Sequence, residues 1–324
     1  MISHLVVGSI NWDVLLFLKK FPSSGEEVSA DFIFESPGGK GGNISVASSK
    51  ILGNNEVGLL SIIGNDLIGR KHIKMLRNKG VITDFIIRHD KIESGKAFVI
   101  IDSKGRNLII TKKNNDAVID EILNEKNSCK LMETIAELKA ITITDLPINF
   151  IEKLLSYKHN KKRLIIWIPG LRSNLKLIKL AKLFNQINYL VLNESESFQL
   201  TNCPESVNAC KKIMGTNKDL GVIITLGENG CLYAKNDQIT KIPTINLSEM
   251  GLLPVNTAGS GDVFAGTFSS LKILNYEDKD AIQLALLAGS IKVTKKEIQA
   301  CPNLNQILQF IKKYKINFKY DLLC

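Results

Sequence analysis

The chain has 324 residues, 44% of them hydrophobic, and its 42 Lys and Arg against 32 Asp and Glu give a formal charge of +10. This length is enough for one domain with a sizeable core, and we expect a single domain over residues 1–324. The basic residues are scattered rather than clustered, and no stretch reaches the ~18 apolar residues of a membrane span, so we expect neither a nucleic-acid nor a membrane partner.

The first segment, MISHLVVGSINWD, lacks the basic region and cleavage site of a signal peptide and predicts a buried strand over 4–10. Short apolar runs recur along the chain without clean alternation, which is typical of buried parallel strands, at 57–63, 140–144, 163–168, 189–193 and 221–227. Helix-length stretches lie between such runs, at 43–52, 66–79, 174–184 and 204–214. This alternation predicts an α/β fold with a mostly parallel central sheet flanked by helices.

Two segments, about 13–37 and 93–113, interrupt this alternation because they lack helix signals. The second contains two strand-like runs around a Ser-Lys-Gly-Arg turn, which indicates a hairpin. We expect a small antiparallel sheet inserted into the α/β body. It could serve as a lid beside a crevice or could be only an edge hairpin.

Residues 256–266 read NTAGSGDVFAG, so small residues precede Asp262 and an apolar helix that we expect to begin near Ser260. Small residues let backbone amides approach a ligand, and the unpaired amides of a helix start attract an anion. A carboxylate there would repel the anion unless it takes a proton from a hydroxyl group beside a phosphate. A plain helix N-cap also explains an Asp, but it would need neither Gly259 nor Gly261.

A second glycine-rich stretch, SPGGKGGN, surrounds Lys40 and ends at Asn43, where we expect an amphipathic helix to start. It exposes backbone at a helix start beside a cation and an amide. It is not a Walker loop, and GxGxxG is absent from both stretches, so a nicotinamide cofactor is not favoured. A turn with surplus glycine is the alternative.

The cysteines and histidines show no metal-binding pattern. The six cysteines form no Cys-x-x-Cys pair, and the four histidines, His159 among them, are isolated in the sequence. This argues against a zinc site and favours reduced thiols, and hence a cytoplasmic location.

Six motifs together resemble the ribokinase family of carbohydrate kinases, also called the PfkB family. In family order they are VVGSINWD, GGKGGN, SGKAFVIIDSKGRNLII, LNESE, TLGENG and NTAGSGD. They span nearly the whole chain. The resemblance implies a three-layer αβα sandwich with a mostly parallel central sheet and a small antiparallel β lid over the carboxyl ends of the strands.

The resemblance also implies an enzyme that transfers the γ-phosphoryl group of ATP to a hydroxyl group of a sugar or nucleoside. Asp262 matches the general base, and the anion hole matches Ala258, Gly259, Ser260 and Gly261. Substrate-binding groups match Asn11, Asp13, Gly39, Lys40 and Asn43, and Asp145 lies where ribokinases usually have a glutamate. Asn193 and Glu196 match residues that organise Mg²⁺ and the phosphates, commonly through water, although a helix cap also explains them. The nucleotide loop matches Thr225, Gly227 and Gly230.

Three departures from the family pattern qualify these expectations. Asn256 stands where ribokinases have Asp, and VTKKEIQAC at 293–301 lacks the usual glycine. Both regions help to build a monovalent-cation site in ribokinases, so we expect weak or absent K⁺ activation. An adenine-side asparagine is replaced near Leu286, which leaves the nucleotide preference open.

The substrate expected first is ribose or another pentose. Asn256 and the run QACPNLN are similar to pseudouridine kinases of the same family, so a nucleoside is the second candidate. A non-catalytic sugar-binding regulator is the alternative of another class, and it would not need the base Asp262. The apolar lid strands could also pair with those of a second copy to form a homodimer.

Overall fold

The computed structural model describes residues 2–112, 133, 135, 137–156, 163–170, 177–318 and 321–322. Residues 174–176 of the expected helix, residue 113 of the second lid segment, and His159, Cys129 and Cys324 lie outside the described residues.

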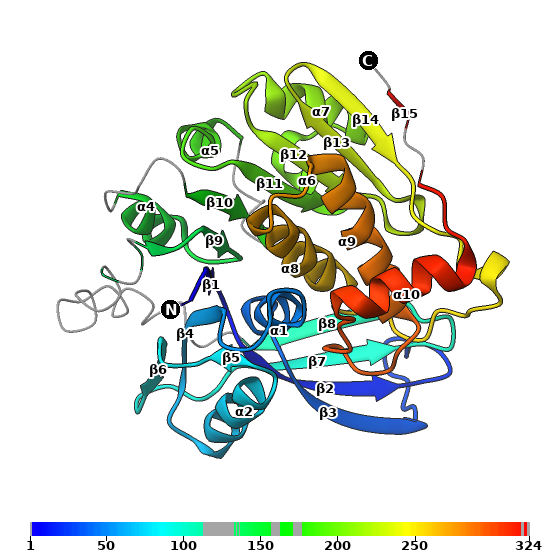
Figure 1. Ribbon diagram of the computed structural model, residues 1–324. Coiled ribbons are helices and arrows are strands. Elements are labelled where there is room, and N and C mark those ends of the chain that lie inside the picture. The colour runs from blue at the N-terminus through cyan, green and yellow to red at the C-terminus, as the bar shows by residue number, and fades with distance from the viewer. Residues whose placement is uncertain are drawn as a thin grey trace.

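Within the described residues, the larger sheet has eleven strands in the order β15-β14-β13-β12-β11-β10-β9-β1-β4-β5, with β6 paired to β4 (Figure 1). The pairings of β13, β14 and β15 are antiparallel, and the remaining pairings are parallel. The parallel strands are β1 (His4–Val7), β4 (Val57–Gly64), β5 (Val81–Ile82), β6 (Ile86–His89), β9 (Ala140–Ile143), β10 (Leu164–Trp167), β11 (Tyr189–Asn193) and β12 (Gly221–Thr225). The antiparallel edge consists of β13 (Cys231–Lys235), β14 (Gln238–Ile242) and β15 (Asp321–Leu322).

Helices cover both faces of this sheet (Figure 1). One face carries α4 (Ile148–Ser156), α5 (Leu177–Phe184), α6 (Glu194–Thr201) and α7 (Ser206–Met214). The other carries α1 (Lys40–Leu52), α2 (Leu67–Asn78), α8 (Ser260–Ile273), α9 (Asp278–Val293) and α10 (Leu304–Tyr314). Two 3₁₀ turns lie at η3 (Gly227–Asn229) and η4 (Ser248–Met250). The predicted αβα arrangement is confirmed, and each expected strand or helix has a counterpart among the described residues, with ends that differ by a few residues.

Strand β1 explains why the apolar runs do not alternate. Leu5 and Val7 pack into the core under α4 to α7, whereas Val6 between them packs into the core under α1 and α8. All three side chains are fully buried. A strand covered on both faces needs apolar residues at every position, which is the pattern of a parallel sheet between two helix layers.

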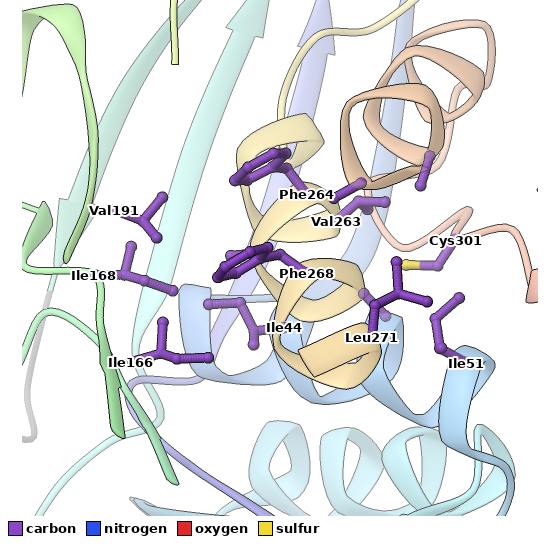
Figure 2. Packing of buried hydrophobic residues seen from close by; sticks show 14 of the residues in the cluster. Ile44, Ile51, Ile166, Ile168, Val191, Val263, Phe264, Phe268, Leu271 and Cys301 are labelled. Carbon is purple, nitrogen blue, oxygen red and sulfur yellow. The ribbon is translucent and has the colours of Figure 1, made fainter. Parts of the chain in front are cut away.

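Helix α8 is fixed against the sheet by two aromatic rings. Phe264 and Phe268 stack with their centroids 6.1 Å apart and point toward Ile166 of β10 and Val191 of β11 (Figure 2). On the α1 side, a Cβ atom at Gly266 would lie 2.6 Å from a backbone oxygen of α1. Tight packing on two sides therefore holds the start of α8, where Asp262 lies.

The second, smaller sheet has the order β3-β2-β7-β8. Its strands are β2 (Asn11–Phe17), β3 (Phe32–Gly38), β7 (Lys96–Ile101) and β8 (Asn107–Lys112). The β2–β3 and β7–β8 pairs are antiparallel, as expected, but the central β2–β7 pair is parallel. Both central strands leave the larger sheet in the same direction, β2 after β1 and β7 after β6, so they enter the small sheet side by side.

Helix α1 begins three residues earlier than expected, at Lys40 rather than Asn43. A Cβ atom at Gly41 would lie 2.7 Å from a backbone atom of Gly8. The glycines therefore continue the helix because its first turn packs directly on the chain between β1 and β2.

No helix in the described ranges is both long enough and apolar enough to cross a membrane.

Candidate active site

Asp262 lies in the first turn of α8, and a chain of hydrogen bonds fixes its carboxylate. Asn43 Nδ2 donates to Asp262 Oδ2 at 2.8 Å, and Gln299 Nε2 donates to Asn43 Oδ1 at 3.0 Å. Lys79 Nζ donates in turn to Gln299 Oε1 at 2.7 Å. The N-cap of α8 is Gly259, so a plain capping role does not explain Asp262.

Lys40, the first residue of α1, lies near the carboxylates of Asp145, Glu196 and Asp262. Its Nζ is 3.9 Å from Glu196 Oε1. Burial opposes the ammonium charge, but attraction to the three carboxylates outweighs it and raises the pKa of Lys40. Burial also raises the pKa of Asp262, while Lys40 and the Asn43 hydrogen bond lower it in part. An oriented carboxylate with a raised pKa can act as a general base.

The four small residues before Asp262 form the N-terminus of α8. Gly259 has φ 79°, and a Cβ atom there would lie 2.7 Å from Ile298 Cγ2, so this position requires glycine. Around Gly261, by contrast, a Cβ atom would meet no atom within 4 Å. Ala258 is buried, whereas Ser260 and Gly261 are more open. The helix start therefore combines a turn that only glycine accommodates with free space in front of it, which suits an anion.

The small sheet docks on the loop before this helix start. Ala258 and Ile298 pack against Leu15, Val99 and Ile101 of the small sheet. Asn107 Nδ2 donates to Thr257 Oγ1 at 3.1 Å, and Thr257 Oγ1 donates to the carbonyl oxygen in the β7–β8 turn at 3.1 Å. The small sheet thus covers the Asp262 loop, which supports a lid rather than a decorative edge hairpin.

Asp13 and Asn11 lie on β2 with little exposure to solvent. A Cβ atom at Gly38 would lie 1.8 Å from Asp13 Oδ2, and one at Gly95 would lie 2.4 Å from Asn11 Oδ1. Asp13 Oδ1 is buried without a hydrogen-bond partner among the described residues. Burial, followed by repulsion from Asp262, raises the pKa of Asp13 to about 8. A buried oxygen of this kind is ready to accept a hydrogen bond from a ligand.

Asp145 follows β9 and is oriented by two hydroxyl groups. Ser9 Oγ donates to Asp145 Oδ1 at 3.1 Å, and Thr144 Oγ1 donates to the same oxygen at 3.0 Å. A Cβ atom at Gly170 would lie 3.0 Å from Lys40 Cε and 3.1 Å from the Asp145 Cβ. The side chains of Asp145 and Lys40 therefore both pack against Gly170. Gly39, with φ 82°, forms the turn that brings Lys40 there.

Asn193 and Glu196 form a capping box at the start of α6. Asn193 Oδ1 accepts from the Glu196 backbone N–H at 2.8 Å, and Glu196 Oε2 accepts from the Asn193 N–H at 3.1 Å. The other carboxylate oxygen of Glu196 faces Lys40. Glu196 therefore caps the helix with one oxygen and lies in the candidate site with the other. Asn193 pairs with Thr225 on the neighbouring strand, which brings both to the carboxyl edge of the sheet.

Gly227 and Gly230 lie in the η3 turn after β12, with φ 58° and 86°. A Cβ atom at Gly230 would lie 2.1 Å from the Ile242 carbonyl oxygen and 2.8 Å from Pro243. Pro243 is also part of the wall of a cavity of about 210 Å³ between β14, α9 and the segment after α10, which is lined by Pro243, Thr244, Ile245, Gln283, Leu287, Ile316, Asn317 and Phe318. The turn therefore adjoins a largely apolar cavity.

Four polar residues of this region were not predicted from the sequence: Ser9, Lys79, Lys292 and Gln299. Ser9, Lys79 and Gln299 reach the site from loops or helix ends that are distant in sequence. Lys292 carried a signal, because it is a lone lysine near the end of the apolar run IQLALLAGSIKV. A charged residue inside such a run is buried only when it has partners.

Comparison with known proteins finds matches over nearly the whole chain. The family model described as pfkB family carbohydrate kinase matches residues 1–305. The deoxyribokinase of Salmonella typhi is 26% identical over 316 residues, which cover 94% of this chain and 97% of that protein. The ribokinase of Dictyostelium discoideum is 27% identical over 323 residues, covering 93% and 98% respectively. The solved ribokinase of Arabidopsis thaliana, complexed with ribose and ATP, superimposes with a TM-score of 0.80 at 22% identity, covering 96% of this chain and 99% of that one.

Proposed function

The chain belongs to the pfkB family of carbohydrate kinases, and on that premise we propose that it transfers the γ-phosphoryl group of ATP to a hydroxyl group of a pentose, with ribose as the first candidate. One observation carries the proposal: the Asp262 carboxylate, oriented by Asn43, lies in the first turn of the helix whose small N-terminal residues leave space for an anion. A phosphoryl group and the hydroxyl that attacks it need these two elements side by side.

In this mechanism Asp262 takes the proton of the attacking hydroxyl group, whose oxygen bonds to the γ-phosphorus as ADP leaves. Of the expected anion hole at 258–261, the amides of Gly259 and Gly261 stabilise the charge on the transferred group, because the Ala258 N–H already donates to Asn256 Oδ1 and the Ser260 N–H to the Thr257 carbonyl oxygen. Lys40, which lies near Asp145, Glu196 and Asp262, offers a positive charge to the transferred group. Asn11, Asp13, Gly39, Asn43 and Asp145 are our candidates for binding the sugar, because carboxylates and amides together can hold several hydroxyl groups.

Mg²⁺ fits the chemistry of this site. Asn193 and Glu196 provide only oxygen donors, and both are engaged in the capping box, so contact through water suits them. The described residues contain no group of three or more His, Cys, Asp or Glu that could hold a metal by themselves. Mg²⁺ usually keeps several waters and binds one or two protein groups together with phosphates. When bound, it neutralises phosphate charge.

The nucleotide is proposed to lie along Thr225, Gly227 and Gly230. The cavity beyond Pro243 adjoins Gly230, and its apolar walls with a few polar groups suit a purine base. The solved relative from Arabidopsis was described with ATP, which agrees with ATP as the donor.

The acceptor follows from Asp13 and Asp145. Both are buried carboxyl groups that lie close enough to Asp262 for the charges to repel, and Asp13 has an oxygen free to accept a hydroxyl hydrogen. The curated relatives from Dictyostelium and Salmonella are a ribokinase and a deoxyribokinase, which supports a pentose. Asn256 and the shorter acid at Asp145 keep a nucleoside as the second candidate.

The test is ADP release from Mg²⁺·ATP with a panel of ribose, deoxyribose, other pentoses, hexoses and nucleosides, pseudouridine included. We expect one strong pentose substrate and a loss of turnover of at least ~10²-fold in the Asp262→Asn variant. Binding of a sugar without ADP release would instead support a non-catalytic sugar-binding regulator. A strong nucleoside substrate would select the second candidate.

We also propose a homodimer formed through the lid. Strand β8 is an edge strand in which every residue is exposed, and it carries Leu108, Ile109 and Ile110 with 44%, 52% and 57% exposure. An exposed apolar edge strand is a template for pairing with another chain. Light scattering should give twice the chain mass of 35.9 kDa, and Ile109→Lys with Ile110→Lys should give the monomer mass. Leu274→Lys, an exposed residue after α8, is the control that should leave the dimer intact.

A cytoplasmic location is proposed from the thiols. Cys203, Cys210, Cys231 and Cys301 are all free, and burial raises the pKa of Cys210 to about 12. Unpaired cysteines of this kind are typical of a reducing compartment.

A further inference from the structure

Lys292 is a buried lysine without a counter-ion among its hydrogen-bond acceptors. It lies near the end of α9 and is 0% exposed. Its Nζ donates to the backbone carbonyl oxygen of Asn256 at 2.8 Å and also to that of Ala258. Both acceptors are neutral. Burying an ammonium group is costly even when carbonyl oxygens accept its hydrogen bonds, and an apolar side chain could fill the same space without that cost. A lysine at this position therefore suggests a role beyond packing.

The loop that binds Lys292 has its internal hydrogen bonds made by a neutral amide, that of Asn256, and not by a carboxylate. Asn256 is fully buried, and its Nδ2 donates to the Lys296 carbonyl oxygen at 2.7 Å. Its Oδ1 accepts from the Ala258 backbone N–H at 2.9 Å. An aspartate at 256 could accept the second bond but could not donate the first. The neutral amide therefore gives Lys292 no carboxylate partner within the loop, and the carboxylates that attract its ammonium group, Asp262 and Glu297, lie outside residues 256–258.

The position of Lys292 sets the direction of a backbone N–H group of the anion hole. The Ala258 carbonyl group points to the Lys292 ammonium group. In a planar trans peptide, the N–H of the next residue points the opposite way, and the described residues contain no cis peptide bond. That next residue is Gly259, the N-cap of α8. Lys292 therefore turns the Gly259 N–H away from itself, and it adds a positive charge behind the helix start.

We propose that Lys292 is a positioning residue for phosphoryl transfer: its ammonium group occupies the place of a bound monovalent cation behind residues 256–258, orients the first peptide of the anion hole and makes the reaction independent of K⁺. The inference rests on the proposed kinase function. Backbone carbonyl oxygens bind K⁺ in proteins. An ammonium group carries the same charge as K⁺ and can bind to the same carbonyl oxygens, so one can replace the other. Burial lowers the pKa of Lys292 to about 8, which leaves the group mainly protonated at pH 7.

The test removes the ammonium group and offers cations in its place. Lys292→Ala opens a space beside two carbonyl oxygens, whereas Lys292→Met fills the space without a charge. Initial rates are measured in Na⁺, K⁺ and NH₄⁺ at one ionic strength. We expect the wild type to vary less than about twofold. The Ala variant should lose ~10²-fold in Na⁺, the cost of a lost oxyanion donor, and regain at least tenfold in K⁺ or NH₄⁺. The Met variant should show no recovery.

A matched control is Lys272→Ala, which removes a poorly exposed lysine whose Nζ donates to the Tyr276 carbonyl oxygen at 2.6 Å, at the far end of α8. It should lower stability and show no cation response. Thermal melting of each variant gives a second readout that needs no substrate. The melting temperature of Lys292→Ala should rise in K⁺ or NH₄⁺ relative to Na⁺, and that of Lys292→Met should not.

Three results would overturn the inference. The wild type could be stimulated tenfold by K⁺, the folded Ala variant could keep full activity in Na⁺, or K⁺ and NH₄⁺ could leave both the rate and the melting temperature of the Ala variant unchanged. A wild type that is silent on every acceptor would refute the proposed function instead, while the melting experiment would still decide whether a cation replaces Lys292.

Discussion

The hydrogen bond from Asn43 to Asp262 allows a direct test of the general base. Asn43→Leu keeps the shape of the side chain but removes the donor that lies 2.8 Å from Asp262 Oδ2. This hydrogen bond favours the ionised carboxylate, and burial opposes it. Without the donor, the pKa of Asp262 should rise further above its ordinary value.

The size of the effect follows from the bond that is lost. A hydrogen bond to a charged group contributes about 1.5–3 kcal/mol, and one pKa unit corresponds to about 1.4 kcal/mol. The pKa of Asp262 should therefore rise by about 1–2 units. Because the base must be deprotonated, the acid limb of kcat/KM should move to higher pH by the same amount.

The assay is the pH profile of kcat/KM for ADP release, measured for the wild type and two variants. Asn11→Leu is the matched control, because Asn11 is a buried amide on the proposed sugar side whose removal should lower kcat/KM without moving the limb. An acid limb that stays in place in Asn43→Leu would show that Asp262 is not the titrating base. A limb that moves equally in both variants would point to a general change in the site.

Two further predictions concern the loop before α8 and the start of α9, where Asp278 is the first residue. Gly259→Ala places a Cβ atom 2.7 Å from Ile298 Cγ2 at φ 79°, so turnover should fall at least tenfold. Gly251→Ala is the control, because Gly251 has φ 68° with open space around it. The control should lose about 1–2 kcal/mol of stability and keep its activity. Asp278 is partly buried, which opposes its ionisation, but hydrogen bonds from Lys272 and two tyrosine hydroxyls outweigh this and lower its pKa to about 2. Asp278→Asn should therefore cost about 2 kcal/mol at pH 7 in denaturant unfolding. That difference should shrink as the pH falls from about 4 toward 2, because the folded-state pKa is depressed, and a constant difference would refute the assignment.

Local patterns in the sequence determined much of the architecture. Apolar runs such as 57–63 predict the parallel strands, because a strand buried on both faces shows no alternation. The small residues around Gly259 and Gly261 predict a helix start that binds an anion. The same stretch predicts Asp262 as the general base, because the carboxylate comes directly after these small residues. These features depend on neighbouring residues, so they are visible in one dimension.

Contacts between distant segments were decided only by the tertiary structure. Asn43 and Asp262 are 219 positions apart, and Gln299 is 256 positions from Asn43, so no local pattern links them. The start of α1 at Lys40 depends on its packing against Gly8, which outweighs the low helix propensity of glycine. The role of Lys292 depends on two carbonyl oxygens that the fold turns toward it. A hydrogen bond forms between groups that are close in space, and closeness in space is a property of the folded chain as a whole.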